Sequence, residues 1–193
     1  MSIGAVILAA GKSSRMGTPK WKLELPNGEF IANHLYNQFT IFGCDTVIVL
    51  NDMDYELASV DKHFCGVKFV KNSRLDLGRL YSLQCGLKNL SSNNPCFVHN
   101  IDNPFVSNDL LTKLKSGLAG FAYALPEFEG QGGHPLLIGS SIVEHILQFK
   151  ETIPDLKQVL CEFEGNRVKI DNPKILININ TPEDYEMFIS GYF

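Results

Sequence analysis

The stretch that decides the fold is "IGAVILAAGKSSRMGTPK", residues 3–20, an apolar run that leads directly into a glycine-containing turn. Its first residues predict a buried strand, because small and β-branched apolar side chains follow one another without a charge. The turn after it carries three cations, Lys12, Arg15 and Lys20. Backbone N–H groups in such a turn can bind an anion. The sequence therefore predicts an anion site at the carboxyl end of the first strand.

This turn fits neither of the two common phosphate-binding patterns. The pattern GxxxxGK[ST] would need a glycine at Val6, inside the predicted strand, and GxGxxG would need a glycine at Ser13. We expect Arg15 and Lys20 to neutralise the anion instead. A glycine-rich connection with solvated cations is the alternative.

Strand-like and helix-like segments alternate along the chain. The expected strands are Ile3–Leu8, Thr46–Leu50, Val67–Lys71, Pro95–His99, Gly120–Leu125, Pro135–Ile138 and Ile175–Ile179. The expected helices are Phe30–Phe42, Asp54–Phe64, Gly78–Leu90, Asn108–Ser116, Ser141–Phe149, Asp155–Phe163 and Pro182–Ser190. This alternation predicts an α/β fold with a mainly parallel sheet covered on both faces. We expect residues 1–193 to form a single domain.

Composition excludes several classes of protein. The net charge of -4 argues against general nucleic-acid binding, since such proteins usually carry positive charge. The apolar N-terminal run is too short for a membrane span, and no signal peptide or anchor is expected. The five cysteines lie far apart and form no CxxC pair, which favours buried thiols in a reducing compartment. We expect a cytoplasmic protein.

Further polar residues follow predicted strands, at the sheet edge where α/β proteins bind ligands. Asp102 is either a Mg²⁺ ligand or part of an Asx turn with Asn103. Asn178 and Asn180 end an apolar run, and strand alternation would place them on one face. His134 follows flexible glycines, where it is either a substrate contact or an ordinary loop histidine.

Five motifs occur in an order typical of one enzyme family. They are "LAAGKSSRMGTPK", "SLQCGL", "DNP", "GGHP" and "NTPEDY". In these motifs the chain resembles the molybdenum-cofactor cytidylyltransferases and guanylyltransferases, over nearly its whole length. The resemblance implies a three-layer α/β/α sandwich with a mixed, mainly parallel sheet. Such a Rossmann-like sheet is related to the nucleotide-diphospho-sugar transferase fold.

The resemblance also implies a reaction and a set of site residues. The reaction is transfer of a nucleoside monophosphate from an NTP to a phosphorylated small-molecule acceptor, with Mg²⁺ as cofactor and pyrophosphate released. Ala9-Ala10-Gly11 favours CTP. The implied nucleotide-binding residues are Leu8, Ala9, Ala10, Gly11, Lys12, Ser13, Arg15, Lys20, Asn72, Gly78 and Ser82. The implied catalytic residues are Arg15, Lys20 and Asp102, the metal ligands Asp102 and Asn180, and the acceptor-binding residues Gly133 and His134.

Three departures from the family pattern keep alternatives open. Ile101 stands where a glycine is usual, Asn180 stands where a carboxylate is usual, and "IPDLKQVL", residues 153–160, replaces the "GDxGxR" segment. The last departure weakens molybdopterin as the acceptor more than it weakens nucleotidyl transfer. A sugar-, polyol- or choline-phosphate nucleotidyltransferase is one alternative. A non-catalytic, nucleotide-binding regulator is another, favoured by the missing carboxylate.

Overall fold

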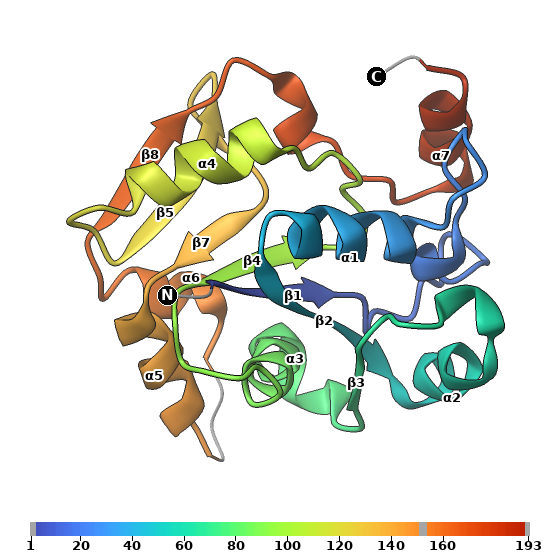
Figure 1. Ribbon diagram of the computed structural model, residues 1–193, viewed down its shortest axis with the longest axis horizontal. Coiled ribbons are helices and arrows are strands. Elements are labelled where there is room, and N and C mark those ends of the chain that lie inside the picture. The colour runs from blue at the N-terminus through green and yellow to red at the C-terminus, as the bar shows by residue number, and fades with distance from the viewer. Residues whose placement is uncertain (1–2, 151–153, 192–193) are drawn as a thin grey trace.

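The apolar run at the start of the chain forms β1 (Ile3–Leu8), which lies in the middle of the sheet. It pairs in parallel with β2 (Cys44–Asn51) on one side and with β4 (Cys96–Asn100) on the other. Beyond β2 lies β3 (Phe69–Asn72), also parallel. The computed structural model describes residues 3–150 and 154–191. Figure 1 shows the arrowheads of β1 and β4 pointing to the same side of the molecule.

The second half of the sheet is antiparallel to the first where the two meet. The strand β7 (Leu136–Ile138) pairs antiparallel with β4, and β5 (Tyr123–Phe128) pairs antiparallel with β7. The two remaining partners of β5 are β6 (Gln131–Gly132) and β8 (Gly165–Lys169). Within the described residues this gives an eight-stranded sheet. The predicted mixed, mainly parallel sheet is confirmed, and its continuity supports our proposal that residues 1–193 form one domain.

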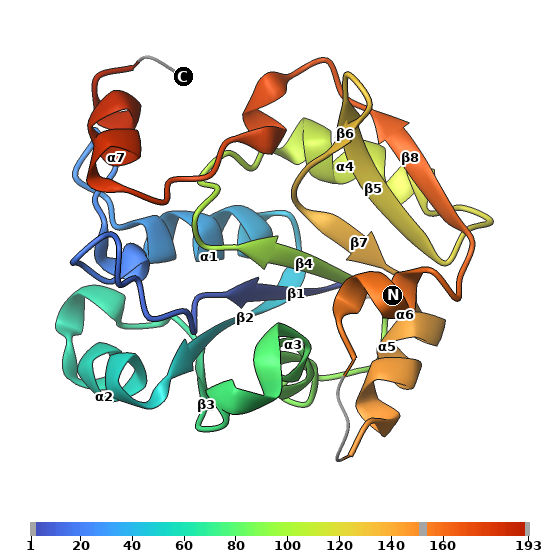
Figure 2. The same ribbon diagram turned by 180° about the vertical axis from the view of Figure 1, so that it is seen from behind.

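Helices cover both faces of this sheet (Figures 1 and 2). One face packs against α1 (Ile31–Ile41) and α4 (Asn108–Gly117), and the other against α3 (Gly78–Leu87) and α5 (Ser140–Gln148). Shorter elements complete the chain: α2 (Asp52–Val60), α6 (Leu156–Leu160), α7 (Pro182–Ile189), and the 3-10 turns η1 (Lys20–Lys22), η2 (Lys62–Phe64), η3 (Leu75–Leu77) and η4 (Pro173–Leu176). The arrangement is the predicted three-layer α/β/α sandwich.

The two hydrophobic cores follow from strand alternation in β1. Ala5 and Ile7 belong to the core beneath α1 and α4, whereas Val6 and Leu8 belong to the core beneath α3 and α5. All four side chains are buried, as expected for a strand covered on both faces. The carboxyl end of β1 is thereby held rigidly where the opening turn begins.

The predicted strand Ile175–Ile179 is wrong. The structure has η4 there, followed by chain that joins no strand ladder among the described residues. Asn172 caps the turn by accepting a hydrogen bond from Lys174 N at 3.0 Å, and Pro173 starts it. The apolar pattern arises because Ile175 and Ile179 are buried in the core without being in a strand. The actual strand, β8, is half exposed and polar, so it carries no apolar alternation.

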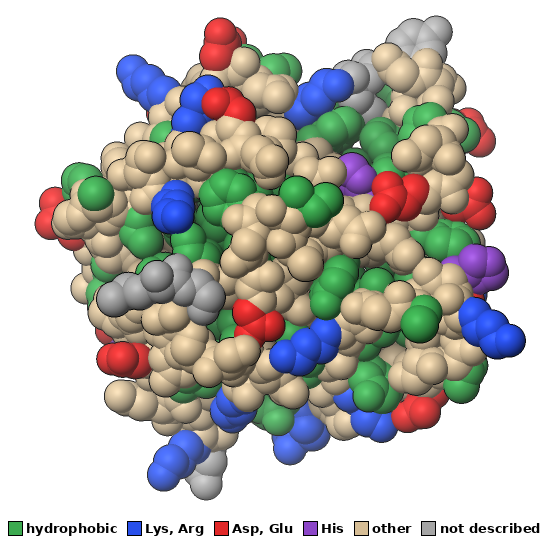
Figure 3. Space-filling view, viewed as in Figure 1, with side chains coloured by type: hydrophobic (Ala, Val, Ile, Leu, Met, Phe, Trp, Pro, Cys, Tyr) green, Lys and Arg blue, Asp and Glu red, His purple; other side chains and the backbone are tan. Residues whose placement is uncertain are grey.

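The segment "IPDLKQVL" lies partly outside the described residues, because its first residue, Ile153, is not among them. Its remainder forms α6 with a capping box at Asp155. No helix in residues 3–150 and 154–191 is both long and apolar enough to cross a membrane. Acidic and basic side chains are interspersed on the face of the molecule shown in Figure 3.

Gly86 allows α3 to approach β1 closely. A Cβ added at this position would clash with the side chain of Val6 and lie 3.0 Å from Val49 Cγ2. Both neighbours are β-branched and stiff, so they cannot easily move aside. We expect Gly86→Val to lower the free energy of unfolding by about 3 kcal/mol through overpacking, measured by urea denaturation. Lys88→Val, at the exposed end of the same helix, is the control, and equal losses in both variants would contradict this prediction.

Candidate active site

A cavity of about 560 Å³ opens at the carboxyl ends of β1 and β4. Four parts of the chain line it: the opening turn, the start of α3, the end of β4, and Asn180 before α7. The lining residues are Leu8, Ala9, Ala10, Gly11, Lys12, Ser13, Ser14, Arg15, Lys20, Leu75, Gly78, Arg79, Ser82, Asn100, Ile101, Asp102 and Asn180. Figure 1 shows that this edge of the sheet faces the side on which α7 lies.

The structure brings most of the sequence-predicted site residues to this cavity. Of the residues assigned to the nucleotide, only Asn72 does not line it among the described residues. Asn72 is fully buried behind the wall, where its Nδ2 donates to Ser82 Oγ at 2.8 Å. Its Oδ1 accepts a hydrogen bond from Arg74 N at 2.8 Å. Asn72 therefore orients a cavity residue, Ser82.

The opening turn is held in an unusual backbone conformation. Ser13 has a φ of 47°, in the left-handed region that side chains rarely adopt. Its carbonyl accepts hydrogen bonds from Met16 N at 2.9 Å and Gly17 N at 3.1 Å, and Met16 is buried in the core. Strained, well-supported turns of this kind occur at ligand sites. Within residues 3–150 and 154–191, Lys12 and Arg15 form no ion pair, so both charges are available to an anion.

The centre of the cavity is a contact between three elements far apart in sequence. Lys20 Nζ lies 2.8 Å from Asn180 Oδ1 and 3.4 Å from Asp102 Oδ2. The side chain of Lys20 is 14% exposed and that of Asp102 is 22% exposed, so the pair is only weakly screened by solvent. A backbone hydrogen bond of 2.8 Å from Ile179 N to Asp102 O holds the segment that carries Asn180 against the turn that carries Asp102.

The neighbouring carboxylate of Asp184 has a structural role. It accepts hydrogen bonds from Asn180 N at 2.8 Å and from Thr181 N at 2.9 Å, which closes a capping box on α7. The bond from Asn180 N is the largest of the influences that lower the pKa of Asp184. Asp184 thus serves the helix start, as its position after Thr181-Pro182 predicts.

Asp102 has one carboxylate oxygen that no described residue satisfies. Its Oδ1 is buried and has no hydrogen-bond partner there, although an unpaired carboxylate oxygen is costly to bury. The carboxamide oxygen of Asn180 has a second lone pair beside the one that accepts from Lys20. Two oxygen donors at one point fit a hard cation such as Mg²⁺, which takes few protein ligands when phosphates supply others. The residues 3–150 and 154–191 contain no cluster of three or more His, Cys, Asp or Glu side chains that could hold a metal ion by itself.

Three polar cavity residues were not assigned from the sequence, Ser14, Arg79 and Asn100, and the last two contact each other. Arg79 Nη2 donates a hydrogen bond to Asn100 Oδ1 across the cavity. Asn100 Nδ2 in turn lies 2.9 Å from His134 Nε2. Position alone could have indicated both, because Arg79 follows Gly78 at a predicted helix start and Asn100 follows a predicted strand.

The segment assigned to the acceptor lies behind the cavity wall. Neither Gly133 nor His134 is among the lining residues. His134 instead contacts the side chain of Asn100, which does line the cavity. A Cβ at Gly133 would lie 2.6 Å from Ile175 O, so this position requires glycine. Burial, followed by the charge of Arg79, lowers the pKa of His134 to about 4. His134 is therefore neutral at physiological pH.

The cavity thus has a cationic turn after β1, a carboxylate after β4 and Asn180 before α7, in an α/β fold of the nucleotidyltransferase class. Residues 5–164 match the family model described as the MobA-like NTP transferase domain. The chain belongs to this family. The resemblance inferred from the five motifs is confirmed.

Two curated relatives cover almost the whole chain. The molybdenum cofactor cytidylyltransferase of Escherichia coli (strain K12) is 27% identical over 186 residues, which are 95% of this chain and 94% of that protein. The probable molybdenum cofactor guanylyltransferase of Carboxydothermus hydrogenoformans is 23% identical over 197 residues, covering 97% of this chain and 95% of that protein.

Solved structures share the fold at low sequence identity. Molybdopterin-guanine dinucleotide biosynthesis protein A from Archaeoglobus fulgidus superposes with a TM-score of 0.72 at 20% identity, covering 98% of both chains. The structure of a Mycobacterium tuberculosis H37Rv protein in complex with manganese superposes with a TM-score of 0.76 at 15% identity, covering 98% of this chain and 99% of the other.

Proposed function

We propose that this nucleotidyltransferase moves CMP from CTP onto a phosphorylated small-molecule acceptor in a Mg²⁺-dependent reaction that releases pyrophosphate. The observation that carries the proposal is the contact of Lys20 with Asp102 and Asn180, beside the unsatisfied Oδ1 of Asp102. It places a fixed cation and two oxygen donors at one point of a cavity whose rim holds Lys12 and Arg15. This arrangement suits a nucleoside triphosphate with a bound divalent cation.

The chemistry asks for positioning and charge stabilisation more than for a protein nucleophile. An oxygen of the acceptor phosphate attacks the α-phosphorus in line, and the bond from that phosphorus to the pyrophosphate oxygen breaks. Lys12, Arg15 and Lys20 stabilise the negative charge that develops on the departing pyrophosphate. Asp102 and Asn180 would hold Mg²⁺, which supplies Lewis-acid polarisation of phosphate oxygens when bound.

The proposed preference for CTP rests on the resemblance of Ala9-Ala10-Gly11 to the cytidine-using members of the family, and the residues at the end of β1 are compatible with it. Ala9 and Ala10 are buried and small, so the nucleobase can approach the backbone closely at this edge of the cavity. Ser82, oriented by Asn72, offers a hydroxyl on the facing wall. The similarity to a molybdenum cofactor cytidylyltransferase supports cytidine, while the similarity to a probable guanylyltransferase makes GTP the competing nucleotide.

The acceptor proposed first is molybdopterin, with sugar, polyol and choline phosphates as alternatives. The proposed binding partners are the nucleotide and the phosphorylated acceptor. We propose no binding to nucleic acid or to a membrane. A cytoplasmic location belongs to this proposal. All five cysteines are free, which supports a reducing compartment where CTP is also available.

A pyrophosphate-release screen tests the proposed reaction. CTP, GTP, UTP and ATP are each combined with Mg²⁺ and a panel of molybdopterin, sugar phosphates, polyol phosphates and phosphocholine. We expect the highest kcat/KM with CTP and one phosphorylated acceptor. Calorimetry of CTP binding with and without Mg²⁺ runs alongside. Metal-dependent binding without turnover on any acceptor would favour the non-catalytic regulator.

Asn180→Asp tests the proposed metal position. A second carboxylate would raise the negative charge around the cation while keeping the side-chain shape, so the Mg²⁺ concentration for half-maximal CTP binding should fall about tenfold. Calorimetry over a series of MgCl₂ concentrations measures it. Asn178→Asp is the matched control, because Asn178 is exposed, lies two residues earlier and does not line the cavity. Equal shifts in both variants would refute direct ligation by residue 180.

A further inference from the structure

Arg79 differs from the other cations of the cavity in where it comes from. Lys12, Arg15 and Lys20 belong to the opening turn and η1, whereas Arg79 is the second residue of α3. Its Nη2 donates to the side-chain oxygen of Asn100, the last residue of β4. Arg79 is therefore held against the end of β4 by a contact that the other three cations do not make.

Only one orientation of the Asn100 carboxamide satisfies both of its side-chain hydrogen bonds. A guanidinium only donates, so Asn100 must turn Oδ1 toward Arg79 and Nδ2 toward His134. With His134 Nε2 as the acceptor at 2.9 Å, the neutral ring carries its proton on Nδ1, which is buried and has no hydrogen-bond partner in the described part of the chain. The neutral state required for this agrees with the lowered pKa of His134. His134 thus fixes the orientation of Asn100, and Asn100 fixes that of Arg79.

The charge of Arg79 stays uncompensated by any direct carboxylate contact in the described part of the chain. Its partner there is a neutral amide, whereas Lys20 is paired with Asp102 and Arg74 with both oxygens of Asp76. A guanidinium has five N–H groups. With one used on Asn100, the remainder can bind a phosphate through two parallel hydrogen bonds.

We propose that Arg79 binds the phosphate group of the acceptor, and that Asn100 and His134 are positioning residues acting through it. This inference rests on the proposed function. In-line attack requires the acceptor phosphate to reach the α-phosphorus from the side opposite the pyrophosphate. The three cations of residues 12–20 serve the pyrophosphate side, and the acceptor needs its own cation to overcome repulsion between two phosphate groups. Arg79 is the lining cation that comes from outside the opening turn, and Asn100 connects it to His134.

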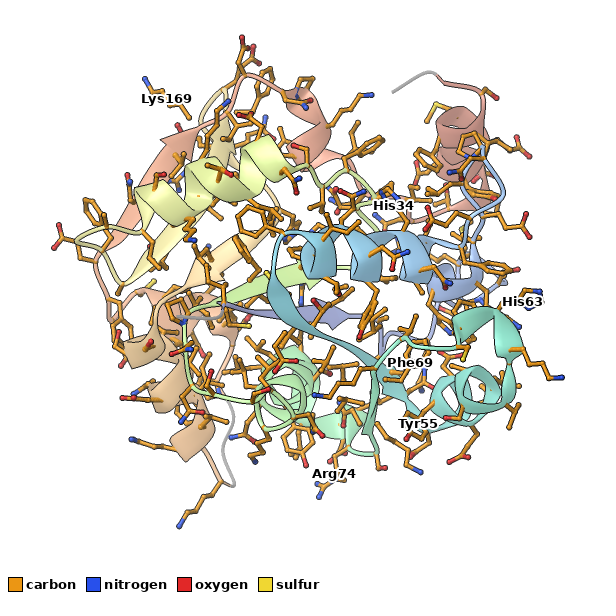
Figure 4. The ribbon with its side chains drawn as sticks, in the orientation of Figure 1. His34, Tyr55, His63, Phe69, Arg74 and Lys169 are labelled. Atoms are coloured by element: carbon orange, nitrogen blue, oxygen red, sulfur yellow. The ribbon has the colours of Figure 1, made fainter. Side chains whose placement is uncertain are left out.

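The test uses inorganic phosphate as the probe. The full chain is saturated with Mg²⁺ and the α,β-methylene analogue of whichever NTP binds most tightly, so that no pyrophosphate can leave. Phosphate is then titrated by calorimetry. We expect saturable binding to the wild-type protein and at least tenfold weaker binding to Arg79→Gln, with the Kd of the nucleotide analogue changed less than threefold. Arg74→Gln is the matched control, since Figure 4 shows Arg74 pointing outward from the body of the protein.

Three further variants test the positioning residues. Asn100→Asp keeps the side-chain shape but gives Arg79 a carboxylate partner, so phosphate binding should weaken at least tenfold although Arg79 is present. His134→Leu removes the acceptor for Asn100 and should weaken phosphate binding about fivefold. His134→Gln restores an acceptor at the position of Nε2 and should keep the phosphate Kd within twofold of wild type. A protein in which His134 had only a packing role would not show this rescue.

Three results would overturn the inference. Arg79→Gln could weaken phosphate binding no more than Arg74→Gln does, or it could abolish binding of the nucleotide analogue, which would assign Arg79 to the nucleotide. The loaded wild-type protein could also fail to bind phosphate saturably. Failure of the wild-type protein to bind any Mg²⁺–nucleotide complex is a separate result, which would overturn the proposed function and this inference together.

Discussion

Replacing Asp102 by asparagine should lower kcat for pyrophosphate release about 10³-fold and remove the dependence of CTP binding on Mg²⁺. Asp102 is the lone carboxylate that lines the cavity within the described residues, and its Oδ1 is buried and unsatisfied there. An amide in its place keeps the shape but removes the negative charge that attracts the cation. A loss of this size corresponds to about 4 kcal/mol of transition-state stabilisation, in the range found when a preorganised charge-stabilising group is removed.

Three measurements distinguish a lower catalytic rate from a lower stability of the folded protein. Steady-state pyrophosphate release gives kcat, CTP calorimetry with and without Mg²⁺ gives the metal dependence, and thermal unfolding reports the fold. Asp109→Asn is the control, because Asp109 is an exposed carboxylate on α4 that pairs with Lys113. If Asp102→Asn kept more than a tenth of the wild-type kcat, the carboxylate could not be the metal ligand that we propose.

Removal of the Lys20 charge should have the second largest effect. Lys20→Gln is expected to lower kcat about 10²-fold and to raise the KM for CTP, because a largely buried ammonium group stabilises charge more strongly than an exposed one. The substitution also leaves Asp102 without its cationic partner. Pyrophosphate release over a range of CTP concentrations separates kcat from KM.

The next lysine along the chain provides the matched control for Lys20. Lys22 lies on the same 3-10 turn but pairs with Asp61, and its side chain is 35% exposed. Lys22→Gln should leave kcat within twofold of wild type. In the double variant Lys20→Gln/Asp102→Asn the losses should be far from additive, because the two side chains are in contact. Simple multiplication of the two single losses would show that Lys20 and Asp102 act independently.

The sequence was sufficient for the parts of the site that follow a strong strand. The opening turn and Asp102 come directly after β1 and β4, whose apolar runs predict strands, and the edge rule for parallel sheets then places them together. Asn180 was found by its motif, and its supposed strand proved to be 3-10 turn and irregular chain. The burial of Ile175 and Ile179 imitates a strand, and nothing in the local pattern reports the missing ladder.

The contact of Arg79 with Asn100 could not be predicted in this way. The two residues lie 21 positions apart on different elements, and their meeting depends on how far α3 extends over the end of β4. The helix α3 packs on β1, where Gly86 allows a close approach. The antiparallel pairing of β7 with β4 places His134 beside Asn100, whereas the family resemblance implied direct contact with the acceptor.

The hydrogen bond from Ile179 N to Asp102 O has a consequence for synthesis of the protein. Lys20 and Asn180 are separated by 160 residues, so the chain that forms β1 to β4 leaves the ribosome long before their contact can exist. N-terminal segments fold first during synthesis, and contacts of large sequence separation form late. A nascent chain can therefore form β1 to β4 and the cationic turn while still lacking the contact of Lys20 with Asn180. The site that we propose is complete only after the segment carrying Asn180 has been synthesised and has packed against Asp102.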